Sequence, residues 1–157
     1  MNADDRSIGR TLRRAVDIEH AFSVCYENLM ALAPDEASKR EIHILSRDEF
    51  AHAELLRRGI EYAQAHPDFF GETVFSEQDL AAIIENVQSI TAAIAQKTVS
   101  YASSLRQLAD LEKNLYRIHM SHLADIREPS LKKLFESLAA GDKTHVERIL
   151  RMIESLA

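Results

Sequence analysis

Apolar residues recur every three or four positions along most of the chain, which is the spacing of one buried face of an α-helix. The first such stripe can be capped at Ser7 or Thr11 and continues until Pro34 ends it. Asp35 can cap a second helix, which continues to Pro67, because a proline disfavours the helical conformation of the residue before it. These two segments predict a hairpin of long helices joined by a short turn.

The second half of the chain predicts another hairpin after a longer connection. Residues 67–75 are expected to form a loop, and Ser76 can cap a short helix to about Gln88, followed by irregular sequence to about Ser100. A third long helix should end before Pro129, and a fourth should begin at that proline, a favoured first helical position. The pattern therefore predicts an all-α fold, an antiparallel four-helix bundle with a long crossover between its second and third helices.

Ionisable residues interrupt the apolar stripes of all four long helices. Glu49 and His52 are three residues apart and share one face of the second helix, as Asp142 and His145 do in the fourth. Glu19 and Glu49 each lie about 15 residues from the turn of the first hairpin, so a rise of about 1.5 Å per residue places them at one level. The candidate site residues are Glu19, Glu49, His52, Glu112, Asp142 and His145.

These candidate residues repeat along the chain at a constant interval. The second set, Glu112, Asp142 and His145, follows the first set by 93 residues at every position. Other residues of the stripes, such as Leu45, recur at the same interval. The interval indicates that the two predicted hairpins face each other about a pseudo-twofold axis.

Four carboxylates at one level of an apolar core require compensating positive charge. Each of them would be costly to bury alone, and no Lys or Arg occurs in the stripes. Two divalent cations would balance the four carboxylates, with two neutral imidazoles completing the ligand set. Oxygen-rich ligation with one imidazole per metal suits iron or manganese. The sequence therefore predicts a two-metal carboxylate centre, with two iron ions expected and manganese, zinc or mixed metals as alternatives.

Composition and charge narrow the function classes. The 157 residues, 46% hydrophobic, suit one domain spanning residues 1–157, and only four Gly and three Pro fit long helices with few turns. The net charge of -6 argues against nucleic acid as a partner. Cys25 is the single cysteine, which excludes an internal disulfide and a Cys-x-x-Cys metal site. Without a leader or an apolar stretch of membrane-spanning length, we expect a cytoplasmic protein that enters no membrane.

The ligand pattern resembles the ferritin-like superfamily, and within it the rubrerythrin-like di-iron proteins. Their motif places Glu on the first and third helices and Glu-x-x-His on the second and fourth; here it reads Glu19, Glu49-Phe-Ala-His52, Glu112 and Asp142-Lys-Thr-His145. The resemblance implies that these residues hold two iron ions, with Glu49 and Glu112 as bridges. It also implies that reduced iron reacts with hydrogen peroxide or dioxygen, as in a peroxidase or ferroxidase. Tyr26 corresponds to a tyrosine that contacts a bridging carboxylate in this group, and its counterpart by the repeat is His119.

Three features depart from that family pattern. Asp142 stands where the family has Glu and is one methylene shorter, so it must draw its helix inward or bind through one oxygen. Leu115 stands where rubrerythrins have a further Glu, one turn after the ligand of the third helix. The cysteine pairs of the rubredoxin module are missing, so electrons would come from a separate donor protein. A homodimer is expected from the resemblance and from the frequency of twofold symmetry.

Two other functions are compatible with the same residues. The protein could bind iron for storage or delivery without reducing a substrate, or it could be a helical scaffold with a structural metal or with none. Among the remaining histidines, His119 and His122 are interpreted as ordinary helix residues, although His119 could also neighbour the site. His20, His43 and His66 are expected to face solvent, and Cys25 is expected to be a small buried residue.

Overall fold

The structure, a computed structural model, describes residues 3–66, 76–122 and 128–156. All secondary structure within these residues is helical. The long helices are α1 (Ala3–Leu29), α2 (Glu36–Ala65), α3 (Glu77–Ala95), α4 (Tyr101–His122) and α5 (Pro129–Glu154), and a short 3-10 turn, η1 (Met30–Leu32), follows α1. The predicted all-α class is therefore confirmed, while the loop expected at 67–75 lies outside the described residues.

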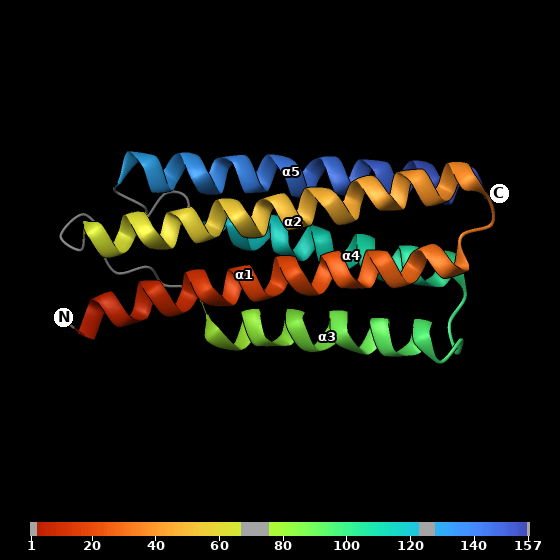
Figure 1. Cartoon of the computed structure of the whole chain (residues 1–157), viewed down its shortest axis with the longest axis horizontal. Coiled ribbons are helices and arrows are strands. Elements are labelled where there is room, and N and C mark those ends of the chain that lie inside the picture. Colours follow the sequence, from red (N-terminus) through yellow and green to blue (C-terminus); the bar gives the residue numbers. More distant parts are fainter. Residues whose placement is uncertain (1–2, 67–75, 123–127, 157) are drawn as a thin grey trace.

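Consecutive helices run in opposite directions along one long axis (Figure 1). α1 packs along α2 and α4 packs along α5, while contacts between α2 and α5 join the two pairs. α3 lies on the far side of α1 from α2 and returns the chain to the end at which α1 and α2 connect (Figure 1). As a result, α2 and α4 run in the same direction and the two helical pairs lie against each other.

Three helices begin where the sequence supplies a capping side chain. Asp35 precedes α2, Ser76 precedes α3, and Glu128 precedes α5, in which Pro129 occupies the first turn. In each case the capping side chain accepts a hydrogen bond from the backbone N–H three residues later, at 2.7, 3.3 and 2.6 Å respectively. The predicted starts of these helices are therefore confirmed.

α3 is longer than the sequence pattern indicated. The expectation of a short helix to about Gln88 is wrong, because α3 continues for about two further turns. Ile90 and Ile94 extend its buried face. The Thr91 hydroxyl donates a 2.9 Å hydrogen bond to the backbone carbonyl four residues earlier, so this polar side chain is satisfied within the helix. Most of the predicted connection is thus a fifth helix.

α1 begins earlier than either predicted cap. It starts at Ala3, so neither Ser7 nor Thr11 marks its N-terminus, and Thr11 is buried within the helix. No Pro or Gly precedes Ser7, so nothing in the sequence stops the helix from extending backwards. The expected end near Pro34 is reached through η1, because the α-helix itself stops at Leu29.

The apolar core follows the predicted stripes and contains polar residues. Phe22, Leu45, Leu108 and Leu138, from α1, α2, α4 and α5, are completely buried. Each of these helices also contributes at least one buried carboxylate to the core. The helices therefore pack around a polar cluster as well as around apolar side chains.

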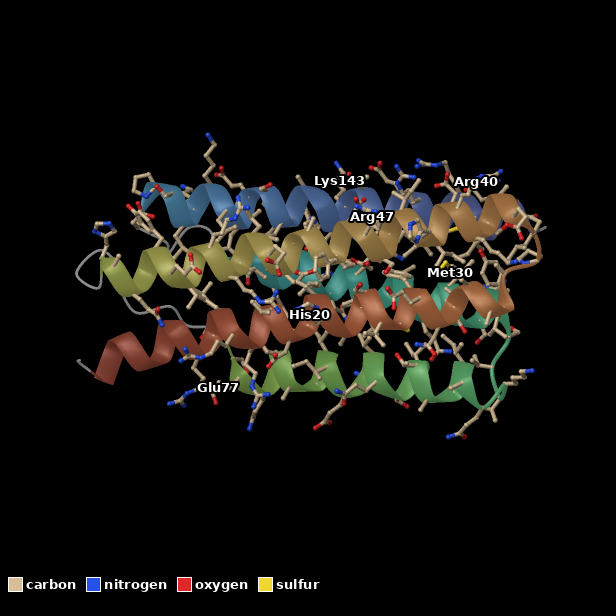
Figure 2. The ribbon with its side chains drawn as sticks, in the orientation of Figure 1. His20, Met30, Arg40, Arg47, Glu77 and Lys143 are labelled. Carbon is tan, nitrogen blue, oxygen red and sulfur yellow. The ribbon has the colours of Figure 1, made fainter. Side chains whose placement is uncertain are left out.

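Charged side chains lie on the outer surface of the helices. Arg47 on α2 and Lys143 on α5 are exposed (Figure 2). Arg10 Nη1 lies 3.1 Å from Glu77 Oε1, which links α1 to α3 at the surface. None of the helices in the described residues is both long and apolar enough to cross a membrane.

The packing of the last turns of α3 can be tested by substitution. Ile94→Ala is expected to lower the free energy of unfolding by about 2–4 kcal/mol, because it removes a buried side chain from the α3 contact face. Ser89→Ala, at an exposed position of the same helix, should change it by less than about 0.5 kcal/mol. Urea denaturation measures both. Equal effects of the two substitutions would contradict the described packing of α3.

Candidate metal centre

The six predicted site residues come together near the middle of their helices. α1 contributes Glu19, α2 contributes Glu49 and His52, α4 contributes Glu112, and α5 contributes Asp142 and His145. Five of them are almost completely buried, whereas the His52 side chain is 15% exposed. Five of them form two overlapping groups, Glu49–His52–His145 and Glu19–His52–Asp142, and within each group one candidate ligand atom per residue lies within 4.8 Å of the others. Glu112 belongs to neither group, but its Oε1 lies 3.6 Å from His145 Nδ1. These buried clusters could hold metal ions.

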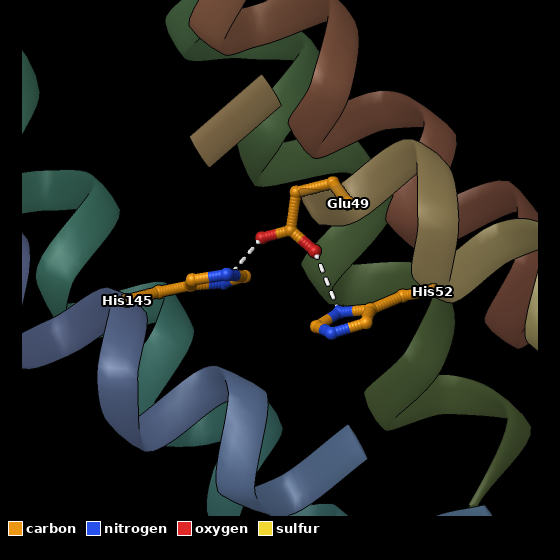
Figure 3. Close-up of side chains that lie close together, drawn as sticks. All are labelled: Glu49, His52 and His145. Carbon is orange, nitrogen blue, oxygen red and sulfur yellow. Dashed lines mark hydrogen bonds and ion pairs between the residues drawn. The ribbon is translucent and has the colours of Figure 1, made fainter. Parts of the chain in front are cut away.

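Glu49 lies between the two imidazoles (Figure 3). Its Oε1 is 2.8 Å from His145 Nδ1, and its Oε2 is 3.2 Å from His52 Nδ1. Each of these nitrogens also approaches a second carboxylate, at 3.6 Å: Glu112 Oε1 for His145 and Glu19 Oε2 for His52. Each imidazole therefore directs Nδ1 toward two carboxylates, one of which is shared.

Several candidate ligand atoms in the cluster have no hydrogen-bond partner in the part of the chain that the structure describes. Glu49 Oε1 and His145 Nδ1 lie close together but form no hydrogen bond, since both atoms are without a hydrogen-bond partner. Within the described residues, the four carboxylates form ion pairs with histidines only. A buried unpaired acceptor costs about 1–3 kcal/mol, and more when charged, so a cation shared by these atoms would remove a large penalty. The unpaired atoms are Glu19 Oε1 and Oε2, Glu49 Oε1, Glu112 Oε2, Asp142 Oδ1 and His145 Nδ1.

Without cations, the cluster takes up protons. Burial and the negative charge of Glu49 raise the pKa of Glu19 to about 7. Burial lowers the pKa of His52, but the carboxylates of Glu19 and Glu49 outweigh this effect and raise the pKa to about 10. Burial lowers the pKa of His145, but the carboxylates of Glu49, Asp48 and Glu112 outweigh this effect and raise it. Imidazolium groups therefore supply the positive charge in the metal-free protein, and metal binding would release their protons.

Two further buried residues, Tyr26 and His119, contact the candidate ligands. The Tyr26 hydroxyl donates a 2.6 Å hydrogen bond to Glu112 Oε1. His119 Nδ1 lies 2.7 Å from Asp142 Oδ2, and the His119 side chain is buried. Of the two interpretations of His119, burial and this hydrogen bond support the second: His119 neighbours the candidate ligands and is not an ordinary helix residue. Of the two Asp142 oxygens, only Oδ1 has no partner.

Two residues beside the ligands were not identified from the sequence. Asp48 Oδ2 lies 3.6 Å from Nε2 of His145, the ring nitrogen that faces away from Glu49. Gly141 packs against His52 so closely that a Cβ at this position would overlap Cε1 and Nε2 of the ring. A glycine inside a helix is unfavourable and often marks a close approach, so Gly141 carried a signal. Asp48 carried none beyond its place before Glu49.

The remaining histidines and the cysteine are only partly as expected. His43 and His66 are exposed, which confirms that prediction. His20 is half-buried, so it faces solvent only in part (Figure 2). The His122 side chain lies outside the part that the structure describes. Cys25 is completely buried, and burial raises the pKa of its thiol to about 11, which confirms a small buried residue.

No protein-family model, curated protein or solved structure matches the chain. The chemistry of the site is therefore judged from its own donor atoms. Four carboxylates and two imidazoles, all but His52 almost completely buried, form an oxygen-rich donor set that suits hard divalent metals.

The metal-free protein is expected to lose stability as pH rises. The folded state holds the Glu19 proton up to a pKa of about 7, whereas the unfolded chain releases it near 4.5. The contribution of Glu19, roughly 3 kcal/mol, is therefore complete below pH 4.5 and is lost by about pH 7. His52 acts in the same direction, since its contribution is complete below its ordinary value of 6.5 and is lost by about pH 10.

Urea denaturation in the presence of a chelator, across a series of pH values, measures this dependence. Glu19→Gln should flatten the curve below pH 7, because glutamine does not titrate. If the free energy of unfolding of the metal-free protein instead rose between pH 5 and 7, Glu19 would not be protonated in the folded state.

The contact between Gly141 and His52 makes a second prediction. Gly141→Ala is expected to lower the free energy of unfolding by about 1–3 kcal/mol and to weaken metal binding, because the added methyl group displaces the ring. Gly9→Ala is the matched control, since a Cβ there meets only the flexible end of Arg13. It should be neutral or stabilising by up to about 1 kcal/mol. Urea denaturation measures the free energy of unfolding, and Co²⁺ titration measures metal binding. Equal results for Gly141→Ala and Gly9→Ala would refute the contact.

Proposed function

We propose that the protein is a di-iron carboxylate oxidoreductase of the rubrerythrin-like type, a peroxidase or ferroxidase that reduces hydrogen peroxide or dioxygen with electrons from ferrous iron. The observation that carries the proposal is the set of buried, unpaired ligand atoms gathered around Glu49 from four helices. The proposal includes a ferritin-like arrangement, in which α1, α2, α4 and α5 form the bundle and α3 is the crossover.

The donor set assigns most ligands to one of two positions. Glu19 and His52 would hold one metal, and Glu112 and His145 would hold the other. Glu49 has one oxygen facing each imidazole, so it would bridge the two metals. Among the ion pairs of the described residues, Glu112 approaches His145 and not His52, so we assign it to a single metal and not to the bridging role that the resemblance implied.

When bound, two ferrous ions would supply the two electrons that convert hydrogen peroxide and two protons into two water molecules. The chain's own residues orient the ligands and exclude water. Tyr26 holds Glu112 through its hydroxyl, and the buried apolar side chains of Phe22 and Leu108 lie one helical turn from Glu19 and Glu112. Exclusion of bulk water strengthens the interaction of the carboxylates with cations. The separate electron-donor protein and the homodimer are part of the proposal and rest on the family resemblance.

The proposed reaction can be tested with protein reconstituted anaerobically with ferrous iron. We expect about two iron ions per chain and, on addition of one peroxide per iron pair, the near-ultraviolet absorption of ferric iron. Glu49→Gln should bind less iron and slow the oxidation at least about tenfold, because it removes the shared ligand. Glu147→Gln, at an exposed position of α5, is the control and should match the wild type.

The outcomes separate the candidate functions. Iron that binds but gives no ferric absorption with peroxide or dioxygen would remove the redox activity and leave an iron-binding protein. A cage of many subunits in size-exclusion chromatography would favour storage. If the wild type bound no divalent metal at all, the whole proposal would fail.

A further inference from the structure

The two halves of the candidate centre, which are related by the repeat, differ in the residues that lie behind the imidazoles. Asp48 and Gly141 occupy equivalent positions, 93 residues apart, each immediately before a candidate carboxylate ligand. Asp48 Oδ2 lies 3.6 Å from His145 Nε2, so a carboxylate stands behind that ring. Gly141 offers His52 no side chain. In the described residues, the carboxylates within 4 Å of His52 are those of Glu19 and Glu49, and both lie nearest Nδ1.

The ligands of the His145 half are oriented from behind. His145 is almost completely buried, and the Asp48 carboxylate lies at ion-pair distance from its Nε2 while Nδ1 faces Glu49 and Glu112. The Tyr26 hydroxyl holds Glu112 Oε1 at 2.6 Å. Because these ligands are already oriented, a metal would lose little free energy in ordering them.

The ligands of the His52 half are held less firmly. Both oxygens of Glu19 lack a hydrogen-bond partner, and His52 is the only one of the six residues with appreciable exposure. Asp142 lies in the same group, but His119 engages its Oδ2 at 2.7 Å and leaves Oδ1 unpaired. This short side chain would therefore bind a metal through one oxygen. The half that contains His52 thus differs from the other in a glutamate whose two oxygens are both unpaired and in a histidine that is partly exposed.

We propose that the two metal positions are unequal, such that the His145 position binds first and tightly and the His52 position binds second, weakly and exchangeably. This inference rests on the proposed metal centre. Asp48 and Tyr26 would be positioning residues for the tight position, and His119 would limit Asp142 to one ligand oxygen. Loss of a partner behind a metal-binding histidine weakens binding about 10–100-fold, so the two positions should differ by at least about tenfold.

Two neighbouring cations repel each other, so even two identical positions would bind metal in two steps. The experiment must therefore identify which position binds the first metal. Glu19 and Glu112 are equivalent by the repeat, and Glu→Gln at each of them disables one position only. Metal-free full-length protein is titrated with Co²⁺ by calorimetry, with visible absorption as a second readout. Glu19→Gln should keep a single tight step like the first step of the wild type. Glu112→Gln should keep a single step that is at least about tenfold weaker.

Asp48→Asn identifies the cause of the difference. Added to Glu19→Gln, it should weaken the remaining tight step about 10–100-fold, whereas added to Glu112→Gln it should have little effect. Asp110→Asn, at an aspartate whose side chain is 75% exposed on α4, is the control for the loss of one charge and should change neither step.

The results can overturn the inference in a way that leaves the proposed function standing. Equal affinities in Glu19→Gln and Glu112→Gln, or a tight step that is insensitive to Asp48→Asn, would show that the two positions are equivalent. Wild-type protein that bound no Co²⁺ would instead remove the metal centre itself. Circular dichroism checks that each variant folds, and His52→Gln with His145→Gln provides a second matched pair if either glutamate variant does not.

Discussion

The rest of the structure depends on how the negative charge of four buried carboxylates is neutralised. Glu19, Glu49, Glu112 and Asp142 come from four helices and meet in a region that apolar side chains seal from water. No Lys or Arg forms an ion pair with them among the described residues. The folded chain therefore holds its acids together with protons on the neighbouring imidazoles, and cations shared among the carboxylates could replace these protons. Such an exchange would couple metal binding to pH and to stability.

The helices position the ligands in a simple way. A carboxylate and a histidine three residues apart lie on one face of a helix, so α2 and α5 each present two ligands to the same space. α1 and α4 add one carboxylate each, and α3 packs outside this group against α1. The reversal of direction between consecutive helices allows residues that are far apart in the sequence to meet at one level (Figure 1).

The two halves of the site share a ligand pattern but differ in the residues behind it. Tyr26 and His119 are equivalent by the repeat, yet Tyr26 contacts Glu112 while His119 contacts Asp142. Behind the His145 ring lies the Asp48 carboxylate, whereas Gly141 packs against the His52 ring. Chemical differences at these neighbouring positions leave the ligand set intact and change how firmly each half is held.

The sequence by itself determined the helices, most of their ends and the six residues that meet, because helical periodicity states which side of its own helix each residue occupies. It did not determine the length of α3, because the polar residues after Gln88 were interpreted as irregular sequence, whereas the Thr91 hydroxyl is bonded to the helix backbone. Only the tertiary structure decided the roles of His119, Asp48 and Gly141. Periodicity contains no information about which residue of another helix lies across the interface, and hydrogen bonds between helices depend on that.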